Sequence, residues 1–337
     1  MTPKPLPASY MKILVLTAAE VRQAVRMQIA IGVMKTAFRD FSMDNSQAPL
    51  RSKISADKSN GTVLLMPAIT DKDLAIKIVS VFDNNQHLAL PLIHAMIIVL
   101  DVSTGKPLAL LEGGSITAIR TGAASGAATD ILARNDAKSV AIIGSGVQAR
   151  TQLEAVCTVR AIETAWVYSP NTKHAEDFAS EMSGSGSIPH DLHVAPSSME
   201  AVQNADIVCT ATTSNTPVFD GNHIKKGTHI NAIGSFTPKM QEVDPVTISK
   251  SLVVVDSRKS VLEEAGDLII PIEANIVKKD HIHAELGEII SNTLLGRTNR
   301  NQITYFKSCG VAVQDVAAAQ LAVQEAKRLG LGTVISL

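Results

Sequence analysis

Residues 139–150 read SVAIIGSGVQAR, a short apolar run that leads directly into glycines. The run at 140–143 is typical of a strand buried in a parallel sheet, and apolar residues at helical spacing follow it. A GxGxxA motif at such a junction lets the backbone approach a pyrophosphate and directs unpaired helix N–H groups toward it. A glycine-rich turn without a ligand is the less favoured interpretation here. The expected contacts of this dinucleotide site are Gly144, Gly146, Val147, Gln148 and Ala149.

The composition of the 337 residues excludes several classes of partner. Lys and Arg total 31 against 32 for Asp and Glu, so the formal net charge is −1 and no basic face for nucleic acid is expected. Aromatic residues make up 3%, which leaves few platforms for stacking on bases. The apolar stretch at 95–100 is too short to cross a bilayer, and MTPKPLPASYMK at the N-terminus has no signal-peptide core. We therefore expect a cytoplasmic protein that binds neither nucleic acid nor membrane.

The cysteine and histidine patterns predict neither disulfides nor a metal site. Cys157, Cys209 and Cys309 are far apart and without a CxxC spacing, so we expect buried, reduced thiols. His190 and His193 lie in a loop-like segment, PHDLH, that lacks a third ligand. No metal is expected.

The chain divides into two units, which differ in the order of their predicted strands and helices. Between residues 51 and 112, β-like runs follow one another with little helix between them, which predicts an antiparallel or mixed sheet. Between 133 and 304, strands alternate with helices, which predicts βαβ units and a parallel sheet. An alanine-rich helix at 311–327 is placed to return to the first unit. We expect an α/β protein with a Rossmann NAD(P)-binding domain at 133–304 and a discontinuous α+β domain at 1–132 with 305–337.

Two further helices are predicted in the first unit, within residues 1–132. Thr17 and Glu20 form a capping box, and the apolar spacing after them predicts one helix that continues to about residue 41. From residue 115 the pattern is helical and rich in alanine and glycine, which permits close packing against a neighbouring element.

The end of the second Rossmann strand leaves the choice of cofactor open. An acidic residue at this place usually binds the ribose hydroxyls, but here Ser169, Pro170 and Asn171 occupy it. No carboxylate is present to repel a 2′-phosphate and no arginine to bind one; Lys173 and His174 are the nearest candidates. Both NADH and NADPH are compatible with these three residues, which we expect to contact the cofactor.

Three cations in the first unit stand where apolar or small residues are expected. Lys77 lies inside an apolar strand, on the face opposite Ile76 and Ile78. Arg51 begins a strand, and Arg120 lies among small helical residues. Each alone is most often a solvated surface charge. Three such cations, converging on a cleft beside a nicotinamide, predict a carboxylate-binding site.

The chain resembles the ornithine cyclodeaminase/mu-crystallin family over nearly its whole length. Lys77 and the ITAIRTGAAS run ahead of GxGxxA are specific to this family, whereas GxGxxA alone is not. The similar segments are 49–51, 104–109, 111–123, 143–149, 234–242 and 310–315.

The resemblance implies a homodimer joined through the first unit, which would also bind an imino- or amino-acid substrate. By the family pattern Arg51 and Arg120 hold the substrate carboxylate, and Lys77 lies beside the reacting carbon and nitrogen. The cofactor contacts expected on the nicotinamide side and beyond the glycine loop are Thr121, Thr212, Gly234 and Asp315.

One departure from the family pattern separates its branches. Ornithine cyclodeaminases have a segment similar to GGDxPGKxEL at this place, and its aspartate binds the substrate amine. This chain has GSFTP at 234–238, so Phe236 stands where that aspartate would be. A phenyl ring suits a compact, less charged substrate, so Phe236 is expected to bind it. The GSFTPKMQE form resembles the branch that reduces cyclic imino acids. We expect reduction of Δ1-pyrroline-2-carboxylate to L-proline, and of its six-membered homologue Δ1-piperideine-2-carboxylate to L-pipecolate.

The expected reaction is hydride transfer from NADH or NADPH to the C=N carbon, with the substrate oriented by the two arginines. Lys77 is either a third carboxylate contact or the proton donor, and the second role requires a lowered pKa. The alternatives are an alanine-type amino-acid dehydrogenase, an ornithine cyclodeaminase and a non-catalytic mu-crystallin-like binder of NADP. The three cations together argue for turnover rather than binding alone.

Overall fold

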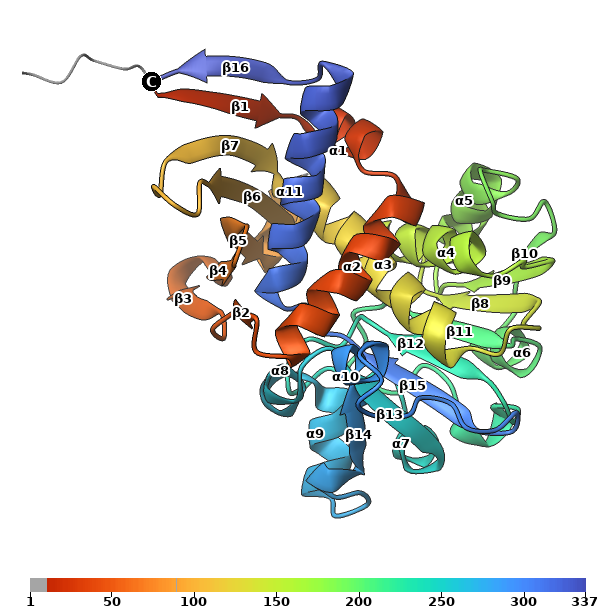
Figure 1. Ribbon diagram of the computed structural model, residues 1–337. Helices are drawn as coiled ribbons and strands as arrows, with labels where there is room; N and C mark the ends of the chain where they lie inside the picture. The colour runs from red at the N-terminus through yellow and green to blue at the C-terminus, as the bar shows by residue number, and fades with distance from the viewer. Residues whose placement is uncertain (1–10, 89) are drawn as a thin grey trace, which may run out of the picture.

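The computed structural model describes residues 11–88 and 90–337, which form two eight-stranded sheets with helices packed against them (Figure 1). The first sheet has the order β16-β1-β7-β6-β5-β4-β2, with β3 paired to β4. Only β1 and β7 pair in parallel among its described strands, so the sheet is mixed, as predicted. Its strands are β1 (Lys12–Leu16), β2 (Ser46–Gln47), β3 (Ser52–Ala56), β4 (Gly61–Thr70), β5 (Leu74–Phe82), β6 (Ile93–Leu100), β7 (Pro107–Glu112) and β16 (Thr333–Ser336).

Four helices pack on this sheet and on one another: α1 (Ala18–Ala24), α2 (Met27–Ser42), α3 (Gly113–Leu132) and α11 (Ala312–Leu329). The last helix, α11, returns from the end of the chain and lies against α2, α3 and the strands β4 to β6 (Figure 1). Its return was expected from the sequence. It brings residue 315 to the same core as residue 77.

The predicted helix through residue 41 is wrong in one respect, because the chain is broken between α1 and α2. The capping box of Thr17 and Glu20 is present and begins α1. Val25 and Arg26 then adopt extended backbone conformations. Val25 and Met27 are both buried, and side chains two residues apart face the same side only when the backbone between them is extended.

The second sheet is parallel throughout its described pairs and has the order β10-β9-β8-β11-β12-β15-β13-β14, the arrangement of a Rossmann fold. Its strands are β8 (Ser139–Ile143), β9 (Thr164–Tyr168), β10 (Leu192–Val194), β11 (Ile207–Thr210), β12 (His229–Ala232), β13 (Ser251–Val255), β14 (Ile282–Glu285) and β15 (Ile303–Lys307). Its helices are α4 (Val147–Val159), α5 (Thr172–Met182), α6 (Ser198–Gln203), α7 (Pro245–Lys250), α8 (Arg258–Glu264), α9 (Gly266–Glu273) and α10 (Leu286–Ile290). The fold is therefore α/β.

Helix α3 connects the two sheets. It contacts β5 and β6 of the first sheet, β12 and β15 of the second, and helices α2 and α4. A Cβ at Gly122 would stand 2.5 Å from the carbonyl oxygen of Thr151 in α4, so only glycine permits this close approach. The small residues of α3 thus serve the close packing that the sequence predicted, and Arg120 is carried into the space between the sheets.

Several elements were not predicted from the sequence, among them β1, β14, β15 and β16. The proposed division into 1–132 with 305–337 and 133–304 remains a prediction; β15 lies across its second boundary. The three cysteines are free and buried, as expected. Among the described residues no helix is both long and apolar enough to span a membrane.

Candidate active site

The glycine loop after β8 has the geometry that a pyrophosphate requires. Gly144 adopts φ +113°, and a Cβ there would stand 2.4 Å from the carbonyl oxygen of Ala211, so this position requires glycine. Gly146 precedes the first turn of α4, and a Cβ there would meet nothing within 4 Å. Val147 is exposed and Gln148 half-buried in that first turn, while Ala149 is buried against the sheet. An open backbone at a helix N-terminus fits a dinucleotide.

This loop lies where ligands bind in Rossmann sheets. The strand order changes direction at β8, which lies between β9 and β11, and ligands bind outside the carboxyl ends of the strands at such a point. Ser169 and Pro170 follow β9 at this edge; Asn171 caps α5 by accepting a hydrogen bond from the His174 N–H (3.3 Å). Lys173, a candidate for a 2′-phosphate, is paired with Asp177 at 2.7 Å.

Lys77 is buried in the first sheet, with 2% of its surface exposed. It shares the inward face of β5 with Ala75 and Val79, as the alternation predicted. Its Nζ lies 2.7 Å from Asp315 Oδ2 in α11 and 3.5 Å from Thr117 Oγ1 in α3. Burial lowers the pKa of Lys77 to about 8, against the opposing effect of Asp315.

Arg120 meets the same aspartate from α3. Its Nε donates to Asp315 Oδ1 (3.1 Å), and its Nη1 donates to Gln314 Oε1 (2.6 Å). Burial alone would raise the pKa of Asp315, but Lys77 and Arg120 outweigh it and hold that pKa below its usual value. Lys77 and Arg120 share the one carboxylate of Asp315, and a pair of buried cations held in this way suits an anionic ligand.

Arg51 joins the group from the segment before β3. Its Nη2 donates to Glu264 Oε2 (2.6 Å) and to the carbonyl oxygens of Cys309 (3.0 Å) and Gly310 (3.3 Å). A Cβ at Gly310 would stand 2.4 Å from Arg120 Nη1, so Gly310 lies directly between the two arginines. The three cations predicted from the sequence are therefore brought to one place. We call Arg51, Lys77, Arg120 and Asp315 the cation cluster.

The remaining predicted residues lie on α3 and on the loops that follow β11 and β12. Thr121 is buried and its hydroxyl donates to the Thr117 carbonyl (2.6 Å). Thr212 follows β11 and Gly234 follows β12, on adjacent strands of the second sheet. Phe236, two residues farther on, is 37% exposed. Their contacts with cofactor or substrate remain predictions, as does the cofactor contact expected of Asp315.

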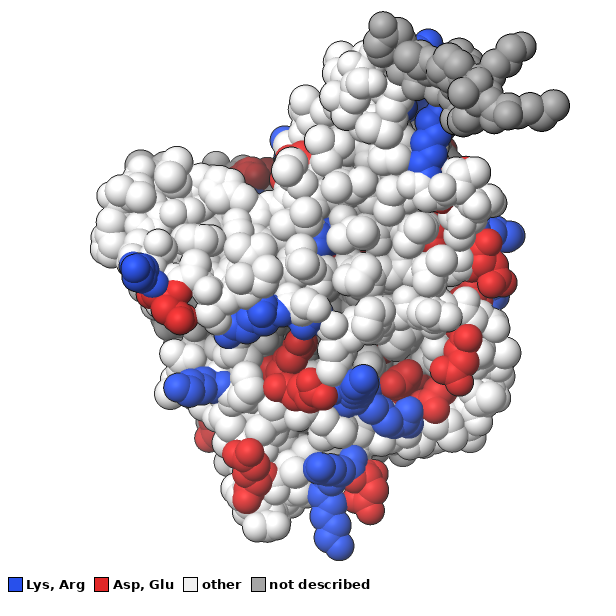
Figure 2. All heavy atoms as spheres, turned by 90° about the vertical axis from the view of Figure 1, so that its left-hand side faces the viewer, with Lys and Arg blue, Asp and Glu red and all other residues white. Residues whose placement is uncertain are grey.

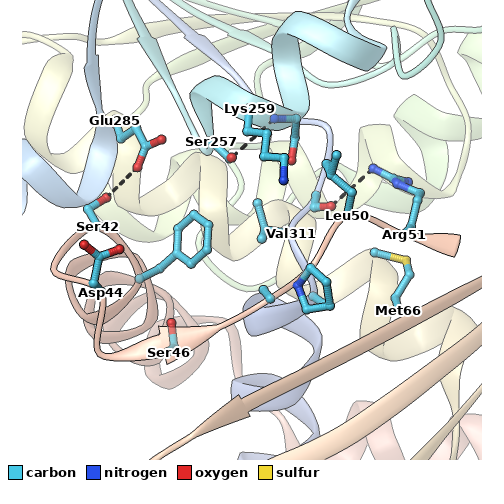
Figure 3. Close-up of a pocket in the computed structure, with 16 residues that line it drawn as sticks. Ser42, Asp44, Ser46, Leu50, Arg51, Met66, Ser257, Lys259, Glu285 and Val311 are labelled. Atoms are coloured by element: carbon cyan, nitrogen blue, oxygen red, sulfur yellow. Dashed lines mark hydrogen bonds between the residues drawn. The ribbon is translucent and has the colours of Figure 1, made fainter.

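A pocket of about 200 Å³ opens beside Arg51 (Figure 3). Met66, Gly310 and Val311 line it, together with Ser42, Ser257, Lys259 and Glu285 on its far side. Lys77, Arg120 and Asp315 do not line it. Arg51 thus forms the boundary between this pocket and the rest of the cation cluster.

Sequence reasoning missed the residues that hold the cations in place. Glu264 and Gln314 bind the arginines directly, and Thr117 approaches Lys77. Asp256 shapes the turn between the arginines by accepting the N–H of Gly310 (2.8 Å). The adjacent Gln314 and Asp315 were a signal, because they are polar residues set between the apolar stretches 311–313 and 316–319. The segment around Glu264 carried no such signal.

The chain matches the model of the ornithine cyclodeaminase/mu-crystallin family over residues 11–329. The chain belongs to this family. Every segment that carried the resemblance, from 49–51 to 310–315, lies within the matched range. The glycine loop and the Rossmann sheet are the parts of this chain that fit a dinucleotide cofactor.

Similar proteins include reductases and dehydrogenases of amino-acid chemistry. The Δ(1)-pyrroline-2-carboxylate reductase of Bacillus cereus is 40% identical over 325 residues, 96% of this chain and 99% of that protein. The structure of the Thermococcus litoralis Δ(1)-pyrroline-2-carboxylate reductase with NADH and L-proline has 44% identity and a TM-score of 0.92, covering 96% of this chain and 100% of that one. An archaeal alanine dehydrogenase dimer with bound NAD has 32% identity and a TM-score of 0.90, covering 96% and 99%.

Proposed function

We propose that this protein reduces Δ1-pyrroline-2-carboxylate to L-proline with NADH or NADPH, and accepts the six-membered homologue. The observation that carries the proposal is the convergence of Arg51, Lys77 and Arg120 on Asp315 and Gly310. Similarity to the Bacillus and Thermococcus reductases supports the choice of substrate. Phe236, in place of an aspartate for a substrate amine, supports a cyclic imine over a diamine.

The mechanism assigns the substrate carboxylate to the arginines. A bound reduced nicotinamide supplies the hydride. Arg120 is held by Asp315 and Gln314, and Arg51 by Glu264, so both guanidinium groups are oriented before the substrate arrives. Fixing the carboxylate fixes which face of the C=N carbon is presented, which is the orientation part of catalysis. Lys77, with its lowered pKa, contacts the carboxylate or supplies the proton for the nitrogen.

The first test is NADH and NADPH oxidation by the purified protein with Δ1-pyrroline-2-carboxylate, and with pyruvate plus ammonia in parallel. Oxidation with the imine supports the reductase. Oxidation with pyruvate and ammonia alone favours an amino-acid dehydrogenase, the second candidate because of the similarity to the archaeal alanine dehydrogenase. No oxidation with either substrate contradicts both.

The pH profile tests the state of Lys77. Its pKa of about 8 makes the side chain an ammonium below that pH and neutral above it. Both proposed roles require the ammonium, so kcat/KM for the imine is expected to fall as the pH rises through about 8. The dissociation constant of NADH, measured over the same range, serves as the control and is expected to stay level. A kcat/KM that is flat through this range contradicts the assignment.

We infer that two copies associate through the first sheet. Ile93 and Met96 on β6 are 47% and 52% exposed, and a groove of about 1,220 Å³ extends from them to α4. The groove also includes Ile78 and Val147. Figure 2 shows few charged side chains over the upper half of the face in view, where the first sheet lies. Exposed apolar patches of this kind mark protein interfaces; the similar alanine dehydrogenase is a dimer.

Met96→Asp is expected to convert the homodimer into monomers, because a carboxylate would have to be buried in the interface. Light scattering after size-exclusion chromatography measures the mass directly. Met199→Asp, at an exposed methionine of α6, is the matched control and is expected to stay dimeric. A Met96→Asp variant with the mass of the wild type contradicts this interface.

For location we propose the cytoplasm. Three free, buried thiols fit a reducing compartment, where disulfides are rare.

A further inference from the structure

Glu242 is a fully buried carboxylate that the proposed mechanism does not use. Its Oε1 accepts the backbone N–H of Thr212 (2.5 Å). Its Oε2 accepts the backbone N–H groups of Gly234 (2.7 Å) and Ser235 (3.2 Å) and the hydroxyl of Thr210 (2.9 Å). One side chain therefore binds two separate loops.

These loops lie at the edge of the sheet where a dinucleotide binds. Thr212 follows β11 and Gly234 follows β12, both at carboxyl ends. A Cβ at Gly144 would lie 3.3 Å from Thr212 Cγ2, which places the first loop beside the glycine turn. A Cβ at Gly234 would lie 2.2 Å from the Thr212 carbonyl oxygen and 2.4 Å from Glu242 Oε1, so the two loops are packed tightly around the carboxylate.

A second buried carboxylate fixes the position of Glu242 itself. Asp267 Oδ1 accepts the backbone N–H groups of Glu242 (2.6 Å) and Val243 (3.1 Å). Its Oδ2 accepts from Lys307 Nζ (2.8 Å) and from the Tyr305 hydroxyl (3.3 Å). Burial and the nearby Asp267 carboxylate raise the pKa of Glu242, and Lys307 opposes that effect. The network thus presents Glu242 to the loops in one position.

We propose that Glu242 is a positioning residue for hydride transfer: it holds the Thr212 and Gly234–Ser235 loops in the arrangement that seats the nicotinamide. This rests on the proposed function. A carboxylate suits the role because all four groups that it binds are donors. An amide of the same size offers one acceptor oxygen, and its NH2 would face a backbone N–H in either orientation.

Glu242→Gln tests the proposal. The glycine loop is unchanged in this variant, so the NADH dissociation constant is expected to stay within about threefold of the wild type. The single-turnover rate of hydride transfer is expected to fall about 10- to 100-fold, because a displaced nicotinamide loses its orientation. The KM for the imine is expected to stay level, and the fluorescence of bound NADH to differ from that in the wild type.

Asp206→Asn is the matched control. Asp206 also binds backbone N–H groups, those of Lys138 (2.9 Å) and Ser139 (3.2 Å), but at the amino ends of β8 and β11, the opposite edge of the sheet. We expect this variant to lose stability and to keep the wild-type hydride-transfer rate and NADH fluorescence. The proposal is overturned if Glu242→Gln behaves as the wild type, or if Asp206→Asn shows the same losses of rate and fluorescence.

A milder variant covers the case in which Glu242→Gln does not fold. Thr210→Val keeps the shape of the side chain and removes one donor to Oε2. A several-fold loss of rate with altered NADH fluorescence supports the proposal, and wild-type values contradict it. The fluorescence comparison needs no imine. A wild-type protein that is inactive on the imine would contradict the proposed function, and the fluorescence of bound NADH in the variants would still test the role of Glu242.

Discussion

Lys77→Ala is expected to lower kcat/KM for the cyclic imine about a thousandfold and to leave NADH binding unchanged. The substitution removes an ammonium that is 2% exposed and 2.7 Å from Asp315. It leaves the glycine loop at 144–149 untouched, because Lys77 belongs to the first sheet. Steady-state kinetics and NADH titration together separate a loss of catalysis from a loss of cofactor.

Lys53→Ala is the matched control, since Lys53 is an exposed lysine of strand β3 in the same sheet. It is expected to retain full activity. Lys77→Arg distinguishes the two roles of Lys77, because an arginine binds a carboxylate but does not release its proton. Retained activity in Lys77→Arg assigns Lys77 to the carboxylate, and lost activity assigns it to the proton. Full activity in Lys77→Ala contradicts the carboxylate site.

Asp315→Asn is expected to be the most destabilising single change in the cation cluster. Asp315 is paired with both Lys77 and Arg120 and is itself buried. Without its charge, two buried cations lose their counter-ion, and removing one partner of a buried pair costs about 3–5 kcal/mol. Urea unfolding followed by circular dichroism measures the loss. The pKa of Lys77 is expected to fall below its wild-type value of about 8, because Asp315 raises that pKa in the wild type.

Glu325→Gln on the same helix is the control for Asp315→Asn. Glu325 forms an exposed pair with Arg328, at 2.7 Å, and solvent screens such pairs. Its loss is expected to change the free energy of unfolding very little. If Asp315→Asn unfolds at the same urea concentration as Glu325→Gln, then Asp315 is not the counter-ion of the cluster.

Local features of the fold were predictable because their physical causes lie within a few residues. The glycine loop, the capping box at Thr17 and the alternation that buries Lys77 each follow from neighbouring side chains. The break in the helix at Val25 was not predictable, because apolar residues at helical spacing continue through it. Only the burial of Val25 and Met27 in the folded protein requires the break. The strands β15 and β16 were missed because short strands carry weak periodicity.

The cations of the site were predictable, and most of their partners were not. A charge in an apolar or small-residue setting is visible in the sequence, as for Lys77 and Arg120. Glu264 lies 213 residues from Arg51 along the chain, and nothing in its own segment indicates the pairing. Glu242 was part of a motif matched to the family, yet its hydrogen bonds to two loops follow only from the packing of β11 against β12.

The place of α11 in the fold also bears on how the protein is made. Arg120 and Asp315 are separated by 195 residues, so on a ribosome adding about 5–20 residues per second the carboxylate emerges about 10–40 s after the guanidinium. During that interval Lys77 of β5 and Arg120 of α3 are without their counter-ion. The strand β15, which lies between β12 and β13, emerges equally late. The second sheet therefore cannot be completed before residues 303–307 have emerged, because β15 pairs with both β12 and β13.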